Sequence, residues 1–540
     1  MNSLQDQSVL VLGLGASGYA MARWVARCGA RLTVADTREQ PPQLAQLREH
    51  LPQARFVSGA FDAALLESSG AQAVFCSPGL SPLQVASVVA AARERGVRVA
   101  GELELFSQAL TDLKTDRHYA PSVLAITGTN GKTTVTALTG QLVERAGKQS
   151  AVAGNIGPTL LETLAEKLDT GPLPQVWVIE LSSFQLEGVS NFEPTAATVL
   201  NVTQDHLDWH GSMQAYAAAK SRVLGRRALM ILNREDPLVM KMLPQPVRAK
   251  GGKIEQRAYL TFGADMPVRP GDSGIEEVNG MAWLVRAQEA DETRKKRAPH
   301  ARKLAVPEGG VPALGRPGGE EKTDSVEEIF IQRLMPVDAL RIRGRHNAVN
   351  ALAALALASA AGCPLGPMLF GLREYRGEPH RVESVGIVNQ IEYFDDSKGT
   401  NVGATVAALR GLGETLDEPG ATGGRRKLVV ILGGDGKGQD FEPLAAPVAR
   451  HVRAAVLIGR DAPAIRAVLE LAGVELLAAE SMEQAVSLAT RHARAGDAVL
   501  MSPACASFDM FRNYPHRAEV FRAAVQAVAD EAGVQLETVG

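Results

Sequence analysis

The sequence is poor in cysteine and has no long apolar run. Its 540 residues include four cysteines and no CxxC pair, which argues against a disulfide framework or a zinc site and favours a reducing cytosol. No stretch reaches the roughly 20 apolar residues that cross a bilayer, and the first residues lack the positive charge and apolar length of a signal peptide. We therefore expect a cytoplasmic protein with no stable membrane insertion.

Charge of one sign is also lacking. Lys and Arg (57) nearly balance Asp and Glu (60), and a formal charge of −3 provides no field that would attract nucleic acid or an anionic membrane. We expect no nucleic-acid partner, and any phosphate ligand must be held by local groups. The composition also lacks the excess of Pro, Ser or Gln that indicates wholesale disorder.

The length exceeds what one core can support, because single cores stop growing at roughly 250–300 residues. Short β-branched runs alternate with helical patterns, which is typical of α/β domains with parallel sheets and crossover helices. The runs form three blocks: 8–13, 31–36 and 73–77; 122–127, 176–180 and 197–201; 427–433, 455–459 and 498–502. We predict domains at 1–117, 118–377 and 378–540, with a polar linker at 111–121 and a second join near 371–379.

Between residues 288 and 328 the chain becomes rich in Gly, Pro and charge and has few apolar residues. This composition predicts a flexible surface insertion. Its basic tetrad, residues 294–297, could be a nucleic-acid patch, but a solvated charge run in a loop is favoured.

A first glycine-rich loop, Gly13-Leu-Gly15-Ala-Ser-Gly18, follows a predicted strand and opens a helical stretch. Backbone N–H groups at such a helix start can hold a diphosphate, and Asp36 at the end of the next strand could bind a ribose hydroxyl. Taken alone, this pattern favours a dinucleotide site and a dehydrogenase. The same turn also serves UDP-sugars, or needs glycine for packing alone, and the pattern leaves these alternatives open.

A second loop, Ile126-Thr-Gly-Thr-Asn-Gly-Lys-Thr-Thr134, joins a predicted strand to a helical pattern. Gly131, Lys132 and Thr133 provide an unhindered backbone donor, a lysine for the β and γ phosphates and a hydroxyl for magnesium. Isoleucine stands at the first position, where the full phosphate-loop motif has glycine, so the loop counted from Gly128 is shorter. We interpret this segment as an ATP site.

Three further residues are candidates for this site. Glu180 closes an apolar strand, and ligands bind at the carboxyl ends of parallel strands, so it is favoured as a magnesium ligand. His206 also follows an apolar strand, and the pattern does not decide between a ligand and a structural histidine. Lys220 lies in an Ala-rich helical pattern, where a lysine is more often a solvated surface charge.

Together these motifs resemble those of the Mur ligases, the ATP-dependent amide-forming enzymes that build the peptide stem of bacterial cell-wall precursors. The likeness covers nearly the whole chain. Segments 128–133, 201–206 and 344–350 resemble the family's phosphate loop, its second metal and phosphate motif and its adenine-contacting helix start. Segments 395–401, 433–437 and 502–508 resemble those of the members that add D-glutamate. Sister enzymes typically carry Tyr-Ala-His where this chain has Ser397-Lys398.

The resemblance assigns candidate residues to each ligand. ATP would contact Gly128, Thr129, Asn130, Gly131, Lys132, Thr133, Thr134, Asn347, Asn350, Arg381 and Asp396. The UDP-linked substrate would contact Gly15, Ala16, Ser17, Asp36, Thr37, Arg38, Ser77, Gly79 and Asn155. D-Glutamate would contact Lys398, Thr400, Lys437, Ser507 and Tyr514, the last in place of the phenylalanine of well-known members. Two magnesium ions would be held by Thr133, Glu180, His206 and a carbamylated Lys220. Lys132, His206 and Lys220 would be catalytic.

The implied reaction joins UDP-N-acetylmuramoyl-L-alanine to D-glutamate through an acyl phosphate, with release of ADP and phosphate, in peptidoglycan precursor synthesis. The first domain would be a Rossmann-like UDP-substrate domain, the second an ATPase domain and the third a Rossmann-like amino-acid domain. The resemblance implies a monomer whose site is completed by domain closure. An NAD-dependent oxidoreductase would leave the second loop unused, and a phosphate-loop regulatory module would leave the third-domain motifs unused.

Overall fold

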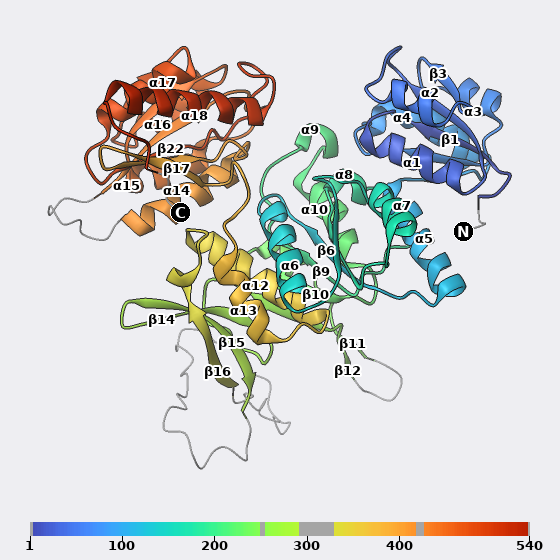
Figure 1. Cartoon of the computed structure of the whole chain (residues 1–540), viewed down its shortest axis with the longest axis horizontal. Helices are drawn as coiled ribbons and strands as arrows, with labels where there is room; N and C mark the ends of the chain where they lie inside the picture. The colour runs from blue at the N-terminus through green and yellow to red at the C-terminus, as the bar shows by residue number, and fades with distance from the viewer. Residues whose placement is uncertain (1–3, 249–253, 291–328, 417–425, 538–540) are drawn as a thin grey trace, which may run out of the picture.

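The computed structural model describes residues 4–248, 254–290, 329–416 and 426–537. The chain forms an N-terminal part (4–117), a central part (122–374) and a C-terminal part (383–537), each with its own large sheet. The N-terminal and C-terminal parts lie on opposite sides of the central part (Figure 1). The predicted α/β class is confirmed, whereas the domain boundaries remain predictions.

The N-terminal part has a five-stranded parallel sheet. Its strands are β1 (Ser8–Leu12), β2 (Arg31–Asp36), β3 (Arg55–Ser58), β4 (Ala73–Cys76) and β5 (Arg98–Ala100). Its helices are α1 (Ala16–Arg27), α2 (Leu44–His50), α3 (Ala63–Ser69), α4 (Pro82–Glu94) and α5 (Glu102–Arg117). The strand order is β3-β2-β1-β4-β5. Because the order reverses between β1 and β4, ligands are expected at the carboxyl ends of these two strands.

Helix α5 runs through most of the segment that we predicted to be a linker. Residues 111–117 are helical, so the linker prediction is wrong there. The helix persists because Leu103, Phe106 and Leu113 recur on one face and are buried. Most of the polar residues that suggested a linker lie on the exposed side of the same helix.

The central part has a nine-stranded mixed sheet and a separate two-stranded one. Its strands are β6 (Ser122–Thr127), β7 (Ser150–Gly154), β8 (Val176–Glu180), β9 (Ala196–Val199), β10 (Leu229–Asn233), β11 (Val247–Arg248), β12 (Ile254–Glu255), β13 (Tyr259–Phe262), β14 (Ser273–Val278), β15 (Met281–Glu289) and β16 (Ile329–Pro336). The order is β16-β15-β14-β13-β10-β9-β6-β8-β7. Neighbours from β7 to β14 are parallel, as predicted, but β14, β15 and β16 form an antiparallel end that we did not predict.

Helices of the central part lie between and after these strands. They are α6 (Lys132–Arg145), α7 (Leu160–Thr170), α8 (Ser183–Leu186), α9 (Leu207–His210), α10 (Met213–Ser221), η1 (Arg222–Leu224), α11 (Pro237–Met240), η3 (Val337–Ala339), α12 (Arg345–Ala360) and α13 (Leu365–Glu374). The predicted helix after the phosphate loop is confirmed by α6.

Strands β15 and β16 flank the predicted insertion. Glu289 pairs with Ile329, so the two strands meet side by side where the insertion leaves and returns. Gln288 is a strand residue whose amide donates to Gln332 Oε1 at 2.6 Å, so the predicted start of the insertion is too early. Residues 291–328, including the basic tetrad, lie outside the described residues.

The C-terminal part has a six-stranded sheet in the order β17-β18-β22-β19-β20-β21. Its strands are β17 (Glu383–Val388), β18 (Ile391–Asp395), β19 (Leu428–Gly433), β20 (Val452–Ile458), β21 (Glu475–Ala478) and β22 (Ala498–Met501). Its helices are α14 (Val402–Leu416), η4 (Glu442–Leu444), α15 (Ala445–His451), α16 (Ala462–Leu469), α17 (Met482–His492) and α18 (Tyr514–Glu531). Only the β17–β18 pair is antiparallel in this sheet of described residues.

The apolar cores divide the chain differently from the sheets. One contiguous cluster combines buried residues of the N-terminal part, such as Trp24 and Phe106, with buried residues of the central part, such as Leu164 and Trp177. The rings of Phe106 and Trp177 meet edge to face, with centroids 5.0 Å apart. The C-terminal part has two clusters made only of its own residues, on the two faces of its sheet.

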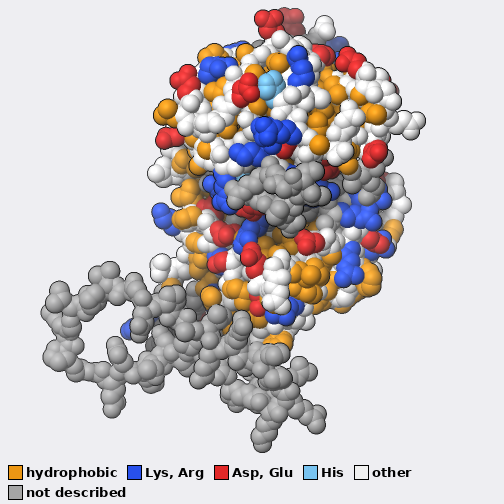
Figure 2. All heavy atoms as spheres, turned by 90° about the vertical axis from the view of Figure 1, so that its left-hand side faces the viewer, with side chains coloured by type: hydrophobic (Ala, Val, Ile, Leu, Met, Phe, Trp, Pro, Cys, Tyr) orange, Lys and Arg blue, Asp and Glu red, His pale blue; other side chains and the backbone are white. Residues whose placement is uncertain are grey.

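The surface agrees with the near balance of charge in the sequence. On the face that Figure 2 shows, Lys and Arg side chains are interspersed with Asp and Glu. Of the helices in the described ranges, none combines the length and the apolar character that spanning a bilayer requires.

Candidate active site

Asp36 fixes the first glycine-rich loop. Gly13 has a φ of +83°, and a Cβ on Gly18 would lie 1.8 Å from the carbonyl oxygen of Gly13, so this turn requires both glycines. Leu14 N–H donates to Asp36 Oδ2 at 2.7 Å, and Arg38 donates to both carboxylate oxygens. Burial raises the pKa of Asp36, but hydrogen bonds from Arg38 and Leu14 outweigh it and hold the pKa at about 2.

Apart from Asn155, which lies in the central part, the other residues predicted to contact the UDP-linked substrate border this loop. Gly15 has open space where a side chain would be, and α1 begins directly after it at Ala16, followed by Ser17. Ser77 follows β4, and its Cβ lies 3.0 Å from where a Cβ of Gly13 would be. Thr37 and Arg38, which follow Asp36, and Gly79, two residues after Ser77, are exposed. The ends of β1 and β4 thus meet at one helix N-terminus, which suits a diphosphate.

The phosphate loop joins β6 to α6, which begins at Lys132. Gly131 has a φ of +81°, a conformation that glycine adopts without strain. The Lys132 ammonium donates to the carbonyl oxygens of Gly128 and Thr129 at 2.9 and 2.8 Å. Burial lowers the pKa of Lys132, and nearby Glu180 opposes this. The lysine therefore lies folded over its own loop.

The start of α12 lies against the phosphate loop. A Cβ on Gly131 would lie 2.8 Å from Asn350 Oδ1, and Asn350 Nδ2 donates to Asn347 Oδ1 at 3.2 Å. Both asparagines are buried, as is Thr134 in the first turn of α6. The helix start predicted to contact adenine is therefore next to the predicted phosphate site.

Glu180 ends β8 beside the strand that leads into the phosphate loop and is 1% exposed. Its Oε1 accepts from Asn155 Nδ2 at 2.9 Å, whereas the buried Oε2 has no hydrogen-bond partner among the described residues. Such an oxygen is unfavourable when left alone, and oxygen ligands are what Mg²⁺ prefers. The Thr133 hydroxyl is a further oxygen donor at this loop. This chemistry fits a magnesium ion.

Lys220 is buried, contrary to the surface position that its Ala-rich segment suggested. It is 1% exposed on α10, its Nζ donates to Gly128 O at 2.8 Å, and the same nitrogen lies 4.5 Å from the ring centre of Tyr216. Burial lowers the pKa of Lys220 well below its ordinary value, and the charge of Lys132 lowers it further. A partly deprotonated amine is the form that carbamylation needs.

His206 stands at the start of α9 with a φ of +53°. Its ring lies edge-on to Phe184, with centroids 4.8 Å apart, and its Nε2 is 3.6 Å from Asp205 Oδ2. Burial lowers the pKa of His206, while Asp205 opposes this, and the neutral imidazole is the form that binds metals. We did not single out His210, whose Nε2 lies 2.9 Å from Ser183 Oγ and whose pKa burial lowers to about 4.

Arg381 and Asp396 come from the side of the C-terminal part. The Arg381 guanidinium donates to Thr133 Oγ1 in the first turn of α6. Asp396 is buried after β18 and accepts from Ser502 Oγ at 2.6 Å. Burial raises the pKa of Asp396 to about 7, although Ser502 and Arg381 both lower it. The Arg381 contact joins the C-terminal side of the chain to the phosphate loop.

Lys398 lies over the ring of Tyr514, with its Nζ 4.0 Å from the ring centre. Burial, together with the charges of Arg381 and Lys132, lowers the pKa of Lys398 to about 8. The carbonyl oxygen of Tyr514 accepts from Ser397 Oγ at 2.8 Å. Tyr514 therefore supports this loop through both its ring and its backbone.

The other predicted D-glutamate contacts lie on loops at the carboxyl ends of neighbouring strands. Thr400 precedes α14, and Lys437 is exposed with a φ of +51°. The loops after β19 and β22 are paired, because Asp435 and Ala506 exchange backbone hydrogen bonds of 3.0 and 2.8 Å. Ser507, next to Ala506, is 2% exposed. The structure thus brings the Lys437 and Ser507 loops together.

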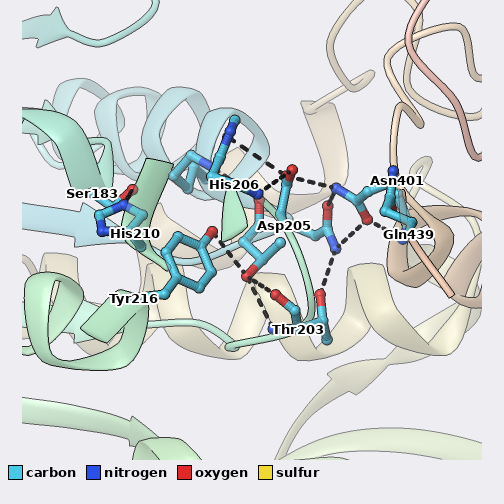
Figure 3. A network of polar contacts seen from close by, with 12 residues as sticks. Ser183, Thr203, Asp205, His206, His210, Tyr216, Asn401 and Gln439 are labelled. Carbon is cyan, nitrogen blue, oxygen red and sulfur yellow. Dashed lines mark hydrogen bonds and ion pairs between the residues drawn. The ribbon is translucent and has the colours of Figure 1, made fainter. Parts of the chain in front are cut away.

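A polar network links the phosphate loop to the C-terminal part, and none of its labelled members except His206 was predicted (Figure 3). Thr203 N–H donates to Thr129 Oγ1 at 3.0 Å, and Asn401 Nδ2 donates to Asp205 Oδ2 at 3.3 Å. Asp205 and Asn401 lie inside segments that resemble family motifs, so this signal was present in the sequence.

Arg517 is a second kind of missed residue. It lies on α18, is 1% exposed, and donates to Ser397 Oγ, Ser397 O and Cys505 O at 3.0, 2.8 and 3.1 Å. Burial lowers the pKa of Arg517 to about 10. It ties the loop of Lys398 to the loop of Ser507. No spacing pattern marks an arginine as buried, because its acceptors come from distant segments.

Comparison with known proteins places these features in one context. Residues 7–101 match the MurD-like N-terminal domain of Mur ligases, 126–266 the Mur ligase middle domain, and 380–505 the Mur ligase glutamate ligase domain. The UDP-N-acetylmuramoylalanine--D-glutamate ligase of Albidiferax ferrireducens is 66% identical over 537 residues, which cover 99% of each chain. That of Ralstonia nicotianae is 55% identical over 535 residues, again covering 99% of each.

Two solved structures share the fold. A MurF ligase from Thermotoga maritima in complex with ADP gives a TM-score of 0.54 at 14% identity and covers 98% of this chain and 97% of its own. The UDP-N-acetylmuramate-alanine ligase of the same organism gives 0.52 at 19% identity and covers 97% and 100%. At such identities the likeness concerns the fold alone.

Proposed function

The chain belongs to the Mur ligase family, and we propose that it catalyses the ATP-dependent joining of D-glutamate to UDP-N-acetylmuramoyl-L-alanine in peptidoglycan precursor synthesis. The observation that carries this proposal is that Lys132, Glu180 and Arg381 lie together at one phosphate loop. Lys398 is also close, because the charge of Lys132 contributes to lowering its pKa. A cation for the phosphates, a carboxylate for magnesium and the amino-acid loop thus share one site.

The N-terminal part would anchor the substrate through UDP. The loop of Gly15, Ala16 and Ser17 presents a helix N-terminus to the diphosphate, and Asp36 holds that loop in place through Leu14. Asn155, on the side of Glu180, would hold the substrate at the other end. Binding energy from the distant UDP group then aligns the alanine carboxylate with the γ-phosphate.

The central part would activate the carboxylate. An oxygen of the alanine carboxylate attacks the γ-phosphorus, ADP leaves, and an acyl phosphate forms. Lys132 and Arg381 neutralise charge on the transferring phosphoryl group. Thr133 and Glu180 would hold one magnesium ion, and His206 with a carbamylated Lys220 would hold a second. Magnesium would supply further charge neutralisation there.

The C-terminal part would deliver the amino acid. D-Glutamate has two carboxylates, and Lys398, Lys437, Thr400 and Ser507 offer cations and hydroxyls for them. Its uncharged amine attacks the carbonyl carbon of the acyl phosphate, inorganic phosphate leaves, and the amine nitrogen gives up a proton. We expect a monomer that works in the cytoplasm, and light scattering of the purified protein would test the monomer.

Phosphate release tests this function directly. The protein is incubated with UDP-N-acetylmuramoyl-L-alanine, ATP and D-glutamate, and with other amino acids in place of D-glutamate. We expect release that requires all three substrates and is lost in Lys132→Ala, while Lys241→Ala, a substitution at an exposed lysine, retains it. Phosphate release that does not depend on the amino acid would contradict the proposal. Oxidation of NADH or NADPH instead of phosphate release would also contradict it.

Carbamylation of Lys220 has its own test. Lys220→Ala should lose ligation and recover part of it when short carboxylates are added, because they would replace the carbamate oxygens. Lys241→Ala is the control. Wild-type protein equilibrated with carbon-13 bicarbonate should show a carbamate resonance that Lys220→Ala lacks. A fully active Lys220→Ala variant would leave Lys220 without this role.

A further inference from the structure

Two side-chain amides face each other where the phosphate loop meets the C-terminal part (Figure 3). Asn130 Nδ2 donates to Asn401 Oδ1 at 3.2 Å, and Asn401 Nδ2 donates to Asn130 Oδ1 at 3.0 Å. The pair is therefore reciprocal, since each amide uses one donor and one acceptor on the other. Such a pair fixes distance and orientation together, which a single hydrogen bond does not.

The central side of this pair is held in place by its own loop. Asn130 N–H donates to Asn201 Oδ1 at 2.8 Å, and the Asn130 carbonyl accepts from Asn201 Nδ2 at 3.1 Å. Asn201 thus binds the backbone of Asn130 on both sides. The side chain of Asn130 is left to reach across to the C-terminal part, from a position two residues before Lys132.

The C-terminal side is equally constrained. Asn401 is 4% exposed, and the oxygen and nitrogen of its side-chain amide each make two hydrogen bonds. Its Oδ1 also accepts from Ala404 N–H at 2.9 Å in the first turn of α14, and its Nδ2 also donates to Asp205 Oδ2 at 3.3 Å. Asn401 therefore caps α14 and contacts the central part with the same side chain.

The backbones approach closely beside the pair. A Cβ on Gly403 would lie 2.7 Å from Thr203 Oγ1, so the start of α14 fits only because residue 403 has no side chain. Gln439 Oε1 accepts from Val402 N–H at 3.1 Å, and Gln439 Nε2 donates to Gly436 O at 3.0 Å. Gln439 connects the Lys437 loop to the same helix start.

We propose that Asn130 and Asn401 form an amide clasp that holds the amino-acid loops in register with the phosphate loop, and that Asn401 is a positioning residue for ligation. Thr400 directly precedes Asn401 and Lys398 lies three residues before it, so the clasp sets how far they stand from Lys132. This inference rests on the proposed function for the identity of the amino acid, but not for the geometry of the clasp.

The strength of the clasp suits a contact that opens and closes. A neutral hydrogen bond replaces bonds to water, so its net free energy is small. Two of them shift the equilibrium between the open and closed clasp by about tenfold or somewhat more. Because the clasp joins the phosphate loop to the amino-acid loops, occupation of either site should favour the other to the same extent.

Asn401→Ser tests the clasp without removing the helix cap. Serine caps helices about as well as asparagine, but its side chain is too short to reach Asn130. We expect the KM for D-glutamate to rise about tenfold. Distances between labels on the central and C-terminal parts should become longer and more widely distributed. Gln526→Ser, a substitution of an exposed amide on α18, should leave both measurements unchanged.

Gly403→Ala tests the same contact from the other side. Alanine favours the helix, so the C-terminal part stays folded, but its methyl group collides with Thr203 Oγ1 and should open the clasp. The same changes in KM and label distance are expected, and adding Thr203→Ala should reverse part of them. A loss of stability alone would not respond to that second substitution.

Unchanged label distances in both Asn401→Ser and Gly403→Ala would overturn the clasp, whatever the activity. A higher KM with unchanged distances would also overturn it, because Asn401 would then act by touching the substrate. If the wild-type protein shows no ligation, the proposed function fails, and the distance measurements still decide whether the clasp exists.

Discussion

The central part is joined to its two neighbours in opposite ways. Toward the N-terminal part, one apolar cluster continues across the joint, with Phe106 against Trp177, and Glu102 accepts from Leu161 N–H at 3.1 Å inside it. Toward the C-terminal part the named contacts are polar, with Arg381 on the phosphate loop and the Asn401 clasp. Among the described residues, the C-terminal cores include none from the central part.

This difference determines which joint can move. Separating a shared core exposes large apolar side chains, at about 1.5–3 kcal/mol for each fully buried side chain such as Phe or Leu. Separating a polar joint exchanges its hydrogen bonds for bonds to water, at about 0.5–1.5 kcal/mol each. We therefore expect the N-terminal part to stay fixed relative to the phosphate loop and the C-terminal part to open and close.

The largest effect is expected from Phe106→Ala. The substitution leaves a cavity beside Trp177 and should destabilise by about 3–5 kcal/mol. Because the cluster is shared, hydrogen exchange should accelerate in the N-terminal and central parts together. Phe521→Ala, in the core of the C-terminal part, should accelerate exchange in that part alone. If Phe106→Ala affected only the N-terminal part, the two joints would be alike.

Arg381→Ala at the polar joint should lower the activity without lowering the stability of the protein. Loss of the guanidinium removes a cation that would meet the transferring phosphoryl group, so kcat/KM should fall about a hundredfold. The midpoint of thermal unfolding should change little, because the joint is not a core. Arg381→Lys keeps the charge without the fork and should recover only part of the activity. A large loss of stability in Arg381→Ala would mean that this joint also carries the fold.

The pH dependence of D-glutamate binding should follow the titration of Lys398 in the C-terminal part. The pKa of Lys398 is lowered to about 8, chiefly by burial, so its cation is lost as the pH rises through about 8. The KM for D-glutamate should therefore increase above that pH. Lys398→Arg stays charged, and its KM should not show this increase. An identical rise in both proteins would exclude Lys398 as the titrating group.

The smallest effect is expected from Arg27→Ala at the N-terminal joint. Arg27 donates to both oxygens of Asp169 on α7 at 2.9 and 2.7 Å, but the two side chains are 35% and 54% exposed. Exposed ion pairs contribute little, since water and salt screen them. Chemical denaturation should show no clear change. A marked loss of stability would show that ion pairs, and not the shared core, hold this joint.

Much of the fold could be predicted because it is written in local patterns. The buried strands carry short apolar runs that include β-branched residues, and every run that we singled out overlaps a strand. The strands that we missed include β3 and β21, short strands exposed at both ends. Their residues show no distinctive hydrophobic pattern, because these segments become strands only by pairing with neighbouring strands in the sheet. The antiparallel end of the central sheet was missed since pairing direction depends on how distant segments meet.

In the candidate site, too, some residues could be identified from local sequence and others could not. Lys132 and its glycines are consecutive, so a motif identifies them. The burial of Lys220 depends on Gly128 and Tyr216, and the contact between Asn130 and Asn401 joins residues far apart in the sequence. Such contacts have no local pattern. The ligand assigned to each candidate residue remains a prediction that the substitutions above can test.

The core that the N-terminal and central parts share also affects the order in which this protein folds during translation. Translation completes the N-terminal part first, and Phe106 must wait for Trp177 before its apolar face is covered. During that interval the nascent chain is exposed to aggregation and to chaperones. The C-terminal part emerges last with its entire core encoded within itself, and it can fold as soon as it leaves the exit tunnel.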